Sequence, residues 1–305
     1  MNAGFFIAED GAKLYSGDAS LATFTETVNA NDGVARPLDS DCPVVLLHSL
    51  FFNGTMFDPV RALLPADMRV LTPDHRNQGR SDAGTNRPSI AQLANDTIRL
   101  IEDVVKGPVH IVGSSMGGYV AMHIAERRPD LLKTCVLSCC TAYAEREPDR
   151  FAALEARIRE EGTSRMGATL VKTMFGERFS AENNALCQAW QQHFEHLSVA
   201  RPAAEVADAV HGVFAREGFE SRLSCLTMPV LLFSGEMDRA KRPADMAFIA
   251  ERVPGSQHVV VADAGHTPPV ERPDLFALAL LRFWRESASN AAQHVLPTST
   301  YQELS

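Results

Sequence analysis

The sequence lacks several features that would assign it to a broad class of proteins. Its 305 residues carry a net charge of −9 and no long block of lysine and arginine, which gives little support to nucleic-acid binding. No apolar run approaches the roughly 20 residues that cross a bilayer. The N-terminal stretch MNAGFFIAEDGAK has neither the basic start nor the long apolar core of a secretory signal. We therefore expect a cytoplasmic protein with no nucleic-acid or membrane partner.

Cysteine patterns that indicate disulfides or metal sites are also missing. No two cysteines form a C-x-x-C pair, and none has a metal-like spacing with histidine. Reduced thiols are the simplest interpretation, and Cys139 and Cys140 are expected to pack as small buried side chains at the end of a strand. The six cysteines are Cys42, Cys135, Cys139, Cys140, Cys187 and Cys225.

The sequence does contain a regular alternation of apolar β-like runs and helical runs. Strands are predicted at residues 44–48, 69–72, 109–112, 134–138, 228–234 and 258–261, and helices at 59–64, 89–105, 116–128, 244–252 and 272–284. This alternation predicts an α/β fold with a mostly parallel sheet and helices on both faces. Residues 5–15 and 21–28, joined around Gly17, are predicted to form an antiparallel hairpin at the sheet edge.

Residues 144–221 interrupt the alternation with helical stretches and no convincing strand between them. The stretches are PDRFAALEARIREEG, TSRMGATLVKTMFG, AENNALCQAWQQHFEHLS and ARPAAEVADAVHGVFARE. They predict an inserted helical cap over the carboxyl ends of the strands, where ligands bind in open α/β sheets. The predicted organisation is a core of residues 1–143 and 222–289, a cap of residues 144–221, and a loose polar tail of residues 290–305.

A tight turn between a predicted strand and a predicted helix carries the clearest chemical signal, in VHIVGSSMGGYVAMHI. Gly113, Ser115 and Gly117 match G-x-S-x-G, a pattern in which small neighbours let a serine occupy strained turn backbone. Centring the pattern on Ser114 would place a valine and a methionine where the glycines belong. The pattern therefore selects Ser115 as the candidate nucleophile.

A nucleophilic serine needs a base that takes its proton and an acid that orients the base. Asp238 follows the strand predicted at 228–234, and His266 follows the next predicted strand, so both are expected on the rim that carries Ser115. Asp263, in the same loop as the histidine, is a rival acid. The chain order serine, acid, histidine is that of enzymes with this elbow.

Two backbone N–H groups should bind the oxyanion that forms when a serine attacks a carbonyl group. Met116 is predicted to supply one, because it directly follows the nucleophile at a helix N-terminus. The other should come from the loop HSLFFNG after the first core strand, with Leu50 as the candidate and Ser49 as the second choice.

Taken together, these residues resemble the α/β-hydrolase fold family over most of the chain. The stretch PDHRNQGRSD is similar to the family's D-x-R-G-x-G-x-S, with Asn77 where glycine is usual, and HSL is similar to its H-G-x-x loop, with Ser49 in place of glycine. The Ser-Leu variant, the following TMFDP and the rhythm of the cap resemble the 3-oxoadipate enol-lactonase subgroup. The chain departs from that subgroup at Phe51, where glycine is common, and at AYAERE at the cap entrance.

The resemblance implies a serine hydrolase that cleaves a small-molecule carboxylic ester or lactone, including an enol-lactone, through an acyl-enzyme on Ser115. His266 would act as the base, Asp238 would fix its tautomer, and neither a metal nor an organic cofactor is implied. Alternatives on the same scaffold are an acyltransferase, a carbon–carbon bond hydrolase and a non-catalytic ligand-binding receptor. A haloalkane dehalogenase is disfavoured, because that branch has aspartate at the elbow. The sequence leaves a homodimer open.

Some cap residues are candidates for contacts with the substrate. Four apolar ones are candidates to line an acyl pocket, although packing between cap helices accounts for each of them as well: Met166, Met174, Phe175 and Trp190. Three arginines are candidate clamps for a carboxylate-bearing lactone, with a solvated surface position as the alternative: Arg150, Arg157 and Arg165.

Overall fold

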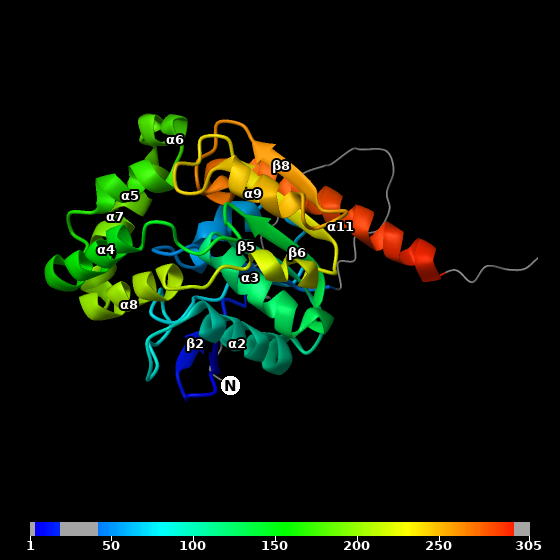
Figure 1. The fold of residues 1–305 in the computed structure, drawn as a ribbon, viewed down its shortest axis with the longest axis horizontal. Helices are drawn as coiled ribbons and strands as arrows, with labels where there is room; N and C mark the ends of the chain where they lie inside the picture. Colours follow the sequence, from blue (N-terminus) through cyan, green and yellow to red (C-terminus); the bar gives the residue numbers. More distant parts are fainter. Residues whose placement is uncertain (1–3, 19–41, 296–305) are drawn as a thin grey trace, which may run out of the picture.

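The computed structural model describes residues 4–18 and 42–295, and its centre is a six-stranded parallel sheet (Figure 1). The sheet order is β4-β3-β5-β6-β7-β8. The strands are β3 (Val44–Leu47), β4 (Val70–Leu71), β5 (Val109–Ser114), β6 (Leu132–Ser138), β7 (Val230–Gly235) and β8 (Gln257–Val261). The predicted fold class is confirmed, and all the carboxyl ends of the strands face the same edge of the sheet.

The strands are nearly continuous apolar runs because helices cover both faces of the sheet. Every residue of β3, β5 and β7 is buried. The covering helices are α1 (Asp58–Arg61), α2 (Ile90–Leu100), α3 (Met116–Arg127), α9 (Pro243–Ala250) and α11 (Pro273–Val295). Trp284 of α11 stacks on His110 of β5, and Phe276 of α11 stacks on Phe233 of β7, which attaches this long helix to the middle of the sheet.

Short elements complete the core. They are the 3-10 turns Gly54–Phe57, Pro129–Leu131 and Glu220–Cys225, the π-turn Ile101–Val105 that follows α2, and α10 (Pro268–Glu271). Ser89 caps α2 by accepting a hydrogen bond from the Gln92 N–H at 3.1 Å. No helix in the described part of the chain combines the length and the apolar character that a membrane span requires.

The N-terminal hairpin differs from the sequence prediction. Residues 5–15 alone form it, as β1 (Phe5–Ile7) paired with β2 (Lys13–Tyr15), and the predicted second strand at 21–28 lies outside the described residues. The turn lies at Gly11, whose φ of 84° is readily adopted only by glycine. The Asp-Gly dipeptide here is a strong hairpin signal. The predicted turn around Gly17 is therefore wrong, and the turn at Gly11 has the local signal.

The C-terminal end also differs. Helix α11 continues to Val295, whereas the sequence predicts a loose tail from residue 290. The segment ESASNAAQH contains three alanines, and alanine has the highest helix propensity, so the backbone continues as helix without an apolar periodicity. Residues 296–305 lie outside the described residues.

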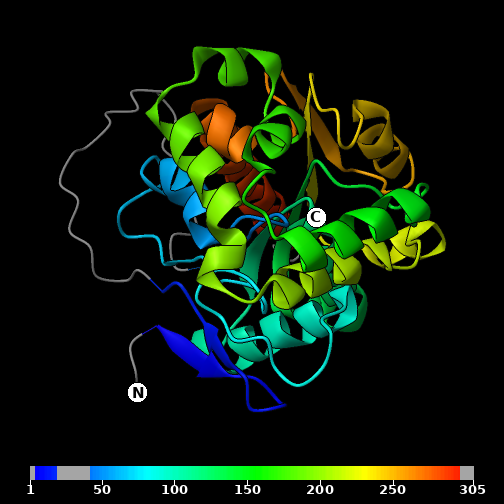
Figure 2. The ribbon, with the colours of Figure 1, turned by 90° about the vertical axis from the view of Figure 1, so that its left-hand side faces the viewer.

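Between β6 and β7 the chain forms a separate helical layer at one side of the molecule, as Figures 1 and 2 show in green. Its helices are α4 (Pro148–Glu161), α5 (Gly167–Met174), α6 (Glu177–Glu182), α7 (Ala185–Ala200) and α8 (Ala203–Phe214). Four of them correspond to the predicted stretches, and the short α6 was not predicted. The chain enters this layer from the carboxyl end of β6, and the Met174 carbonyl of α5 accepts the His266 N–H at 3.1 Å, so the layer lies over the rim that carries the candidate site.

Candidate active site

Ser115 occupies the sharp turn between β5 and α3, with φ 51° and ψ −107°. A side chain in this region is strained, and the surrounding structure has to hold it there. The Ser115 N–H donates to the Ser138 carbonyl at 2.7 Å, which ties the turn to the neighbouring strand. A Cβ atom at Gly113 would lie 2.2 Å from the Gly117 carbonyl oxygen, and one at Gly117 would lie 2.1 Å from the Leu47 carbonyl oxygen. Both positions of the elbow therefore require glycine.

The two adjacent serines have different surroundings. Ser114 is fully buried at the end of β5, and its Oγ accepts a hydrogen bond from Ser49 Oγ at 3.0 Å. The Ser49 Oγ also lies 3.2 Å from the Ser114 carbonyl oxygen, so the serine that replaces the usual glycine links the HSL loop to the elbow. Ser115 keeps 9% of its surface exposed and points its hydroxyl at a histidine.

The structure brings Ser115, His266 and Asp238 together on one rim. The Ser115 Oγ lies 2.8 Å from His266 Nε2, and His266 Nδ1 lies 2.9 Å from Asp238 Oδ2. The other carboxylate oxygen of Asp238 accepts the N–H groups of Ala240 and Lys241, each at 2.8 Å. These bonds hold the carboxylate in one orientation, with one oxygen directed at the imidazole.

This arrangement decides where the imidazole proton lies. A carboxylate accepts only, so Nδ1 carries the hydrogen and donates it to Asp238. Nε2 of the neutral ring is then an acceptor, and the hydroxyl of Ser115 donates to it. The ring can therefore accept a proton from the serine without changing its orientation.

The rival acid lies elsewhere. Asp263 has φ 59° in the turn after β8, its side chain is 56% exposed, and it pairs with Arg178 of α6 at 3.3 Å. Asp238, by contrast, has a fully buried side chain against the histidine. The geometry therefore places Asp238, and not Asp263, beside the base.

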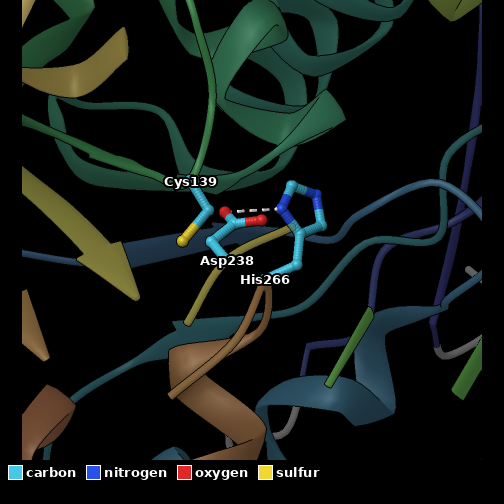
Figure 3. Close-up of side chains that lie close together, drawn as sticks. All are labelled: Cys139, Asp238 and His266. Carbon is cyan, nitrogen blue, oxygen red and sulfur yellow. Dashed lines mark hydrogen bonds and ion pairs between the residues drawn. The ribbon is translucent and has the colours of Figure 1, made fainter. Parts of the chain in front are cut away.

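Behind the carboxylate lies Cys139, at the end of β6 (Figure 3). Its sulfur, an Asp238 oxygen and a His266 ring nitrogen lie within 4.8 Å of one another, a distance at which three donors can share a metal ion. However, the oxygen and the nitrogen already bond each other, and burial raises the pKa of the Cys139 thiol well above its usual range. The thiol keeps its proton, and the cluster fits a packed support for the Asp238 carboxylate better than a set of metal ligands.

The two predicted oxyanion donors lie on either side of the elbow. Met116 is the first residue of α3, where a helix leaves its N–H groups without internal partners. Leu50 lies in a tight turn in which the Phe52 N–H donates to the Ser49 carbonyl at 3.1 Å. Within residues 4–18 and 42–295, no group accepts from the N–H of Leu50 or of Met116, so both remain free to bind an oxyanion.

Two histidines that the sequence interpretation did not single out hold this turn. His48 Nδ1 lies 2.8 Å from the Ser49 carbonyl oxygen, and its Nε2 accepts the His75 N–H at 2.9 Å. Nδ1 must then carry the ring hydrogen. Burial lowers the pKa of both histidines, so both rings are neutral near pH 7. The His48 ring holds the turn through its hydrogen bonds, whereas His75 contributes its backbone N–H.

The loop that carries His266 is fastened to the cap by Glu271. This half-buried carboxylate accepts the N–H groups of Gly176, Gly265 and Thr267 at 2.7, 2.9 and 3.1 Å. The His266 N–H also donates to the Met174 carbonyl at 3.1 Å. Burial raises the pKa of Glu271. No local motif indicates this residue, because its cap partner is 95 positions away in the sequence.

Aromatic side chains from the core and the cap meet above the oxyanion loop. Phe52 contacts Trp190, Phe194 and Phe175, with ring centroids 4.7, 5.1 and 6.1 Å apart. All four predicted apolar cap candidates are buried. The three arginines predicted as clamps are exposed: the side chains of Arg150 and Arg157 are 70% and 54% exposed beside Glu147 and Glu161, and Arg165 is exposed too. They occupy solvated positions and form no clamp at the site.

Comparison with known proteins identifies the family and supports the fold. Residues 44–280 match the model of the alpha/beta hydrolase family. The chain is 25% identical over 233 residues to 3-oxoadipate enol-lactonase 1 of Acinetobacter baylyi, covering 76% of this chain and 85% of that protein. It is also similar to the structure of a thermophilic esterase from Thermogutta terrifontis, at 25% identity and a TM-score of 0.79, with 92% and 96% of the two chains covered. An enol-lactonase from Burkholderia xenovorans LB400 shares the fold, at 22% identity and a TM-score of 0.77, with 92% and 98% covered.

Proposed function

Because this chain is an enzyme of the alpha/beta hydrolase family, we propose that it is a serine hydrolase that cleaves a small-molecule carboxylic ester or lactone. One observation carries the proposal. A serine hydroxyl in a strained elbow, an imidazole and a buried carboxylate are linked by hydrogen bonds of 2.8 and 2.9 Å. This is the arrangement that turns a poor nucleophile into an effective one at neutral pH.

In the proposed reaction, Ser115 Oγ attacks the carbonyl carbon while His266 Nε2 takes the hydroxyl proton. Asp238 stabilises the imidazolium that forms, and the tetrahedral intermediate carries its negative charge on the former carbonyl oxygen. His266 then donates the proton to the leaving oxygen as the carbon–oxygen bond breaks, which leaves an acyl-enzyme. Water repeats the sequence, and its attack releases the acid and restores the serine.

We assign the oxyanion to the N–H groups of Leu50 and Met116. Both donors have no acceptor in the described part of the chain and flank the nucleophile, and the position of Met116 at a helix N-terminus adds a favourable partial charge. Preorganised donors of this kind typically contribute about 3 kcal/mol each to transition-state binding. They require no particular side chain, so Ser49 in place of glycine is compatible with the role.

The substrate is proposed to present an apolar acyl group toward the cap. The rings of Phe52, Phe175 and Trp190 meet above the oxyanion loop, and the three arginines predicted as clamps are exposed. The similarity to an enol-lactonase and to an esterase supports a lactone or ester bond as the one that is cleaved. A cytoplasmic location is also proposed, because all six cysteines are free thiols.

A fluorophosphonate probe tests the proposal directly, because it reacts with activated serines. We expect covalent labelling of the wild-type protein that disappears in Ser115→Ala and persists in Ser114→Ala. A panel of p-nitrophenyl esters and small lactones should then give turnover that Ser115→Ala abolishes. If the probe does not label the wild-type protein, and Ser115→Ala still binds an ester or lactone of the panel, the chain is a ligand-binding protein and not a hydrolase.

A further inference from the structure

Phe51 lies in the tight turn of the oxyanion loop and adopts φ 69°, the left-handed region that favours glycine. The Phe52 N–H donates to the Ser49 carbonyl, so Leu50 and Phe51 are the two central residues of a β-turn. A positive φ at the second of them alone is the signature of a type II turn. A type I turn differs from it by a rotation of the middle peptide and suits a phenylalanine better. Something must therefore hold the middle peptide in its less favoured orientation.

Two side chains from distant segments bond the peptide groups of Phe51. Its N–H donates to Gln78 Oε1 at 3.2 Å, and its carbonyl oxygen lies 3.0 Å from Nε2 of His193, on cap helix α7. Phe51 and Gln78 are buried, with 3% and 6% of their surfaces exposed. Burial lowers the pKa of His193, so the ring is neutral and its Nε2 carries the hydrogen that is donated.

The other end of Gln78 reaches the second oxyanion donor. Its Nε2 donates to Met116 Sδ at 3.4 Å, so one side-chain amide connects the loop of Leu50 with the residue after the nucleophile. His48 holds the preceding peptide through the Ser49 carbonyl. The Leu50 N–H is in that same planar peptide and points away from the held carbonyl. Its direction therefore depends on bonds to three consecutive peptides.

We propose that Gln78 and His193 are positioning residues for the reaction, which hold Phe51 in its left-handed conformation and thereby keep the Leu50 N–H directed at the oxyanion. The inference rests on the proposed function. It explains why phenylalanine is tolerated where glycine would adopt the turn unaided. It also makes the geometry of the oxyanion site depend on the position of the cap relative to the core, because His193 is on cap helix α7.

The test compares Gln78→Met with the wild-type enzyme, since methionine has a similar length and offers the Phe51 N–H only a weak sulfur acceptor in place of the amide oxygen. We expect kcat to fall about 10- to 100-fold with KM within about threefold, because the lost alignment matters mainly in the transition state. The affinity for a trifluoromethyl ketone, which forms a tetrahedral adduct, should fall in parallel with kcat/KM. Gln192→Met, an exposed change on α7, is the matched control and should keep wild-type rates.

A second substitution separates positioning from simple destabilisation. Phe51→Gly in the Gln78→Met background should recover about tenfold in kcat, because glycine adopts a positive φ without support. On the cap side, His193→Phe should lower kcat and His193→Gln, which keeps a donor, should restore most of it. This pair tests the proposal even if Gln78→Met folds poorly.

Three results would overturn the proposal: a kcat within twofold of wild type in both Gln78→Met and His193→Phe, no recovery with glycine at position 51, or unchanged affinity for the ketone. In each case the wild-type enzyme still hydrolyses its ester, so the hydrolase assignment stands. If the wild-type protein is not labelled by fluorophosphonate at all, the proposed function fails and the positioning role fails with it.

Discussion

The rim of the sheet and the cap above it differ in the interactions that fix their side chains. On the rim, Ser115, His266 and Asp238 each have a defined hydrogen-bond partner at 2.8 or 2.9 Å. In the cap, Trp190 and Phe194 pack by ring contacts at several angles, 53° and 83° against Phe52. Hydrogen bonds depend steeply on direction, whereas apolar burial depends mainly on area and volume. The rim should therefore tolerate no exchange of residue type, and the cap should tolerate exchanges that conserve volume.

The largest effect is expected from removal of the base on the rim. His266→Ala should lower kcat by about 10⁵-fold or more with little change in stability, because the serine loses its only proton acceptor in the described part of the chain. Steady-state kinetics on an ester found in the panel measures the loss. His196→Ala, an exposed histidine on α7, is the control and should leave kcat unchanged. A loss of less than tenfold would remove His266 from the mechanism.

The next effect distinguishes the two candidate acids. Asp238→Asn should lower kcat by about 10³- to 10⁴-fold, because an amide favours the wrong imidazole tautomer and cannot stabilise the imidazolium. Asp263→Asn should change kcat less than twofold, since its side chain is 56% exposed and pairs with Arg178. The ratio of the two effects is the measurement. Equal effects would contradict the assignment of Asp238.

In the cap, the expected effect is on stability rather than on chemistry. Phe194→Ala should lower the free energy of unfolding by about 3–5 kcal/mol, because a fully buried ring leaves a cavity. Phe194→Leu should cost less, about 1–2 kcal/mol, because more of the volume is kept. Denaturant unfolding followed by fluorescence measures both, with the exposed Val199→Ala as a control. If leucine proves as costly as alanine, the cap packs as specifically as the rim.

The smallest effect concerns the polar contact between Asp10 of the N-terminal hairpin and Arg76. Two guanidinium nitrogens of the buried Arg76 bond Asp10 at 2.8 and 3.1 Å and hold the pKa of that carboxyl at about 2, below the ordinary 3.8. A lowered pKa stabilises the fold above about pH 4, and the contribution is lost as pH falls through about 2. Because Asp10 keeps 23% of its side chain exposed, Asp10→Asn should cost about 1 kcal/mol at pH 7.

The pH dependence is the sharper part of that prediction. The difference in unfolding free energy between wild type and Asp10→Asn should shrink as the pH is lowered from 5 to about 2. Urea unfolding at several pH values measures it. A difference that grows toward acid pH would show that the carboxylate is not the source of the stabilisation.

Much of the fold could be predicted because its signals are local. Alternating apolar strands and helices predicted the parallel sheet, and a serine between glycines at a strand-to-helix turn indicated the elbow. The hairpin was wrongly placed even though its signal, Asp10 before Gly11, was also local. Helix α11 extends to Val295 because alanine has a high helix propensity, and the periodicity of apolar residues gives no sign of that extension.

The supports of the site could not be predicted in the same way. Glu271 bonds Gly176 from 95 positions away, and His193 bonds Phe51 from 142 positions away. Neither residue lies in a pattern with a fixed spacing to its partner. A side chain that acts through a distant segment is recognisable only when the two segments are placed together.

By itself, the sequence determined the alternation of elements, the position of the elbow and the types of residue at the carboxyl ends of β7 and β8, because each depends on neighbours within a few residues. Only the tertiary structure decided which carboxylate faces His266, and which side chains hold the turn that contains Phe51. Those outcomes depend on distances of about 3 Å between segments far apart in the chain. Such distances are set by how the sheet, the loops and the cap pack against one another.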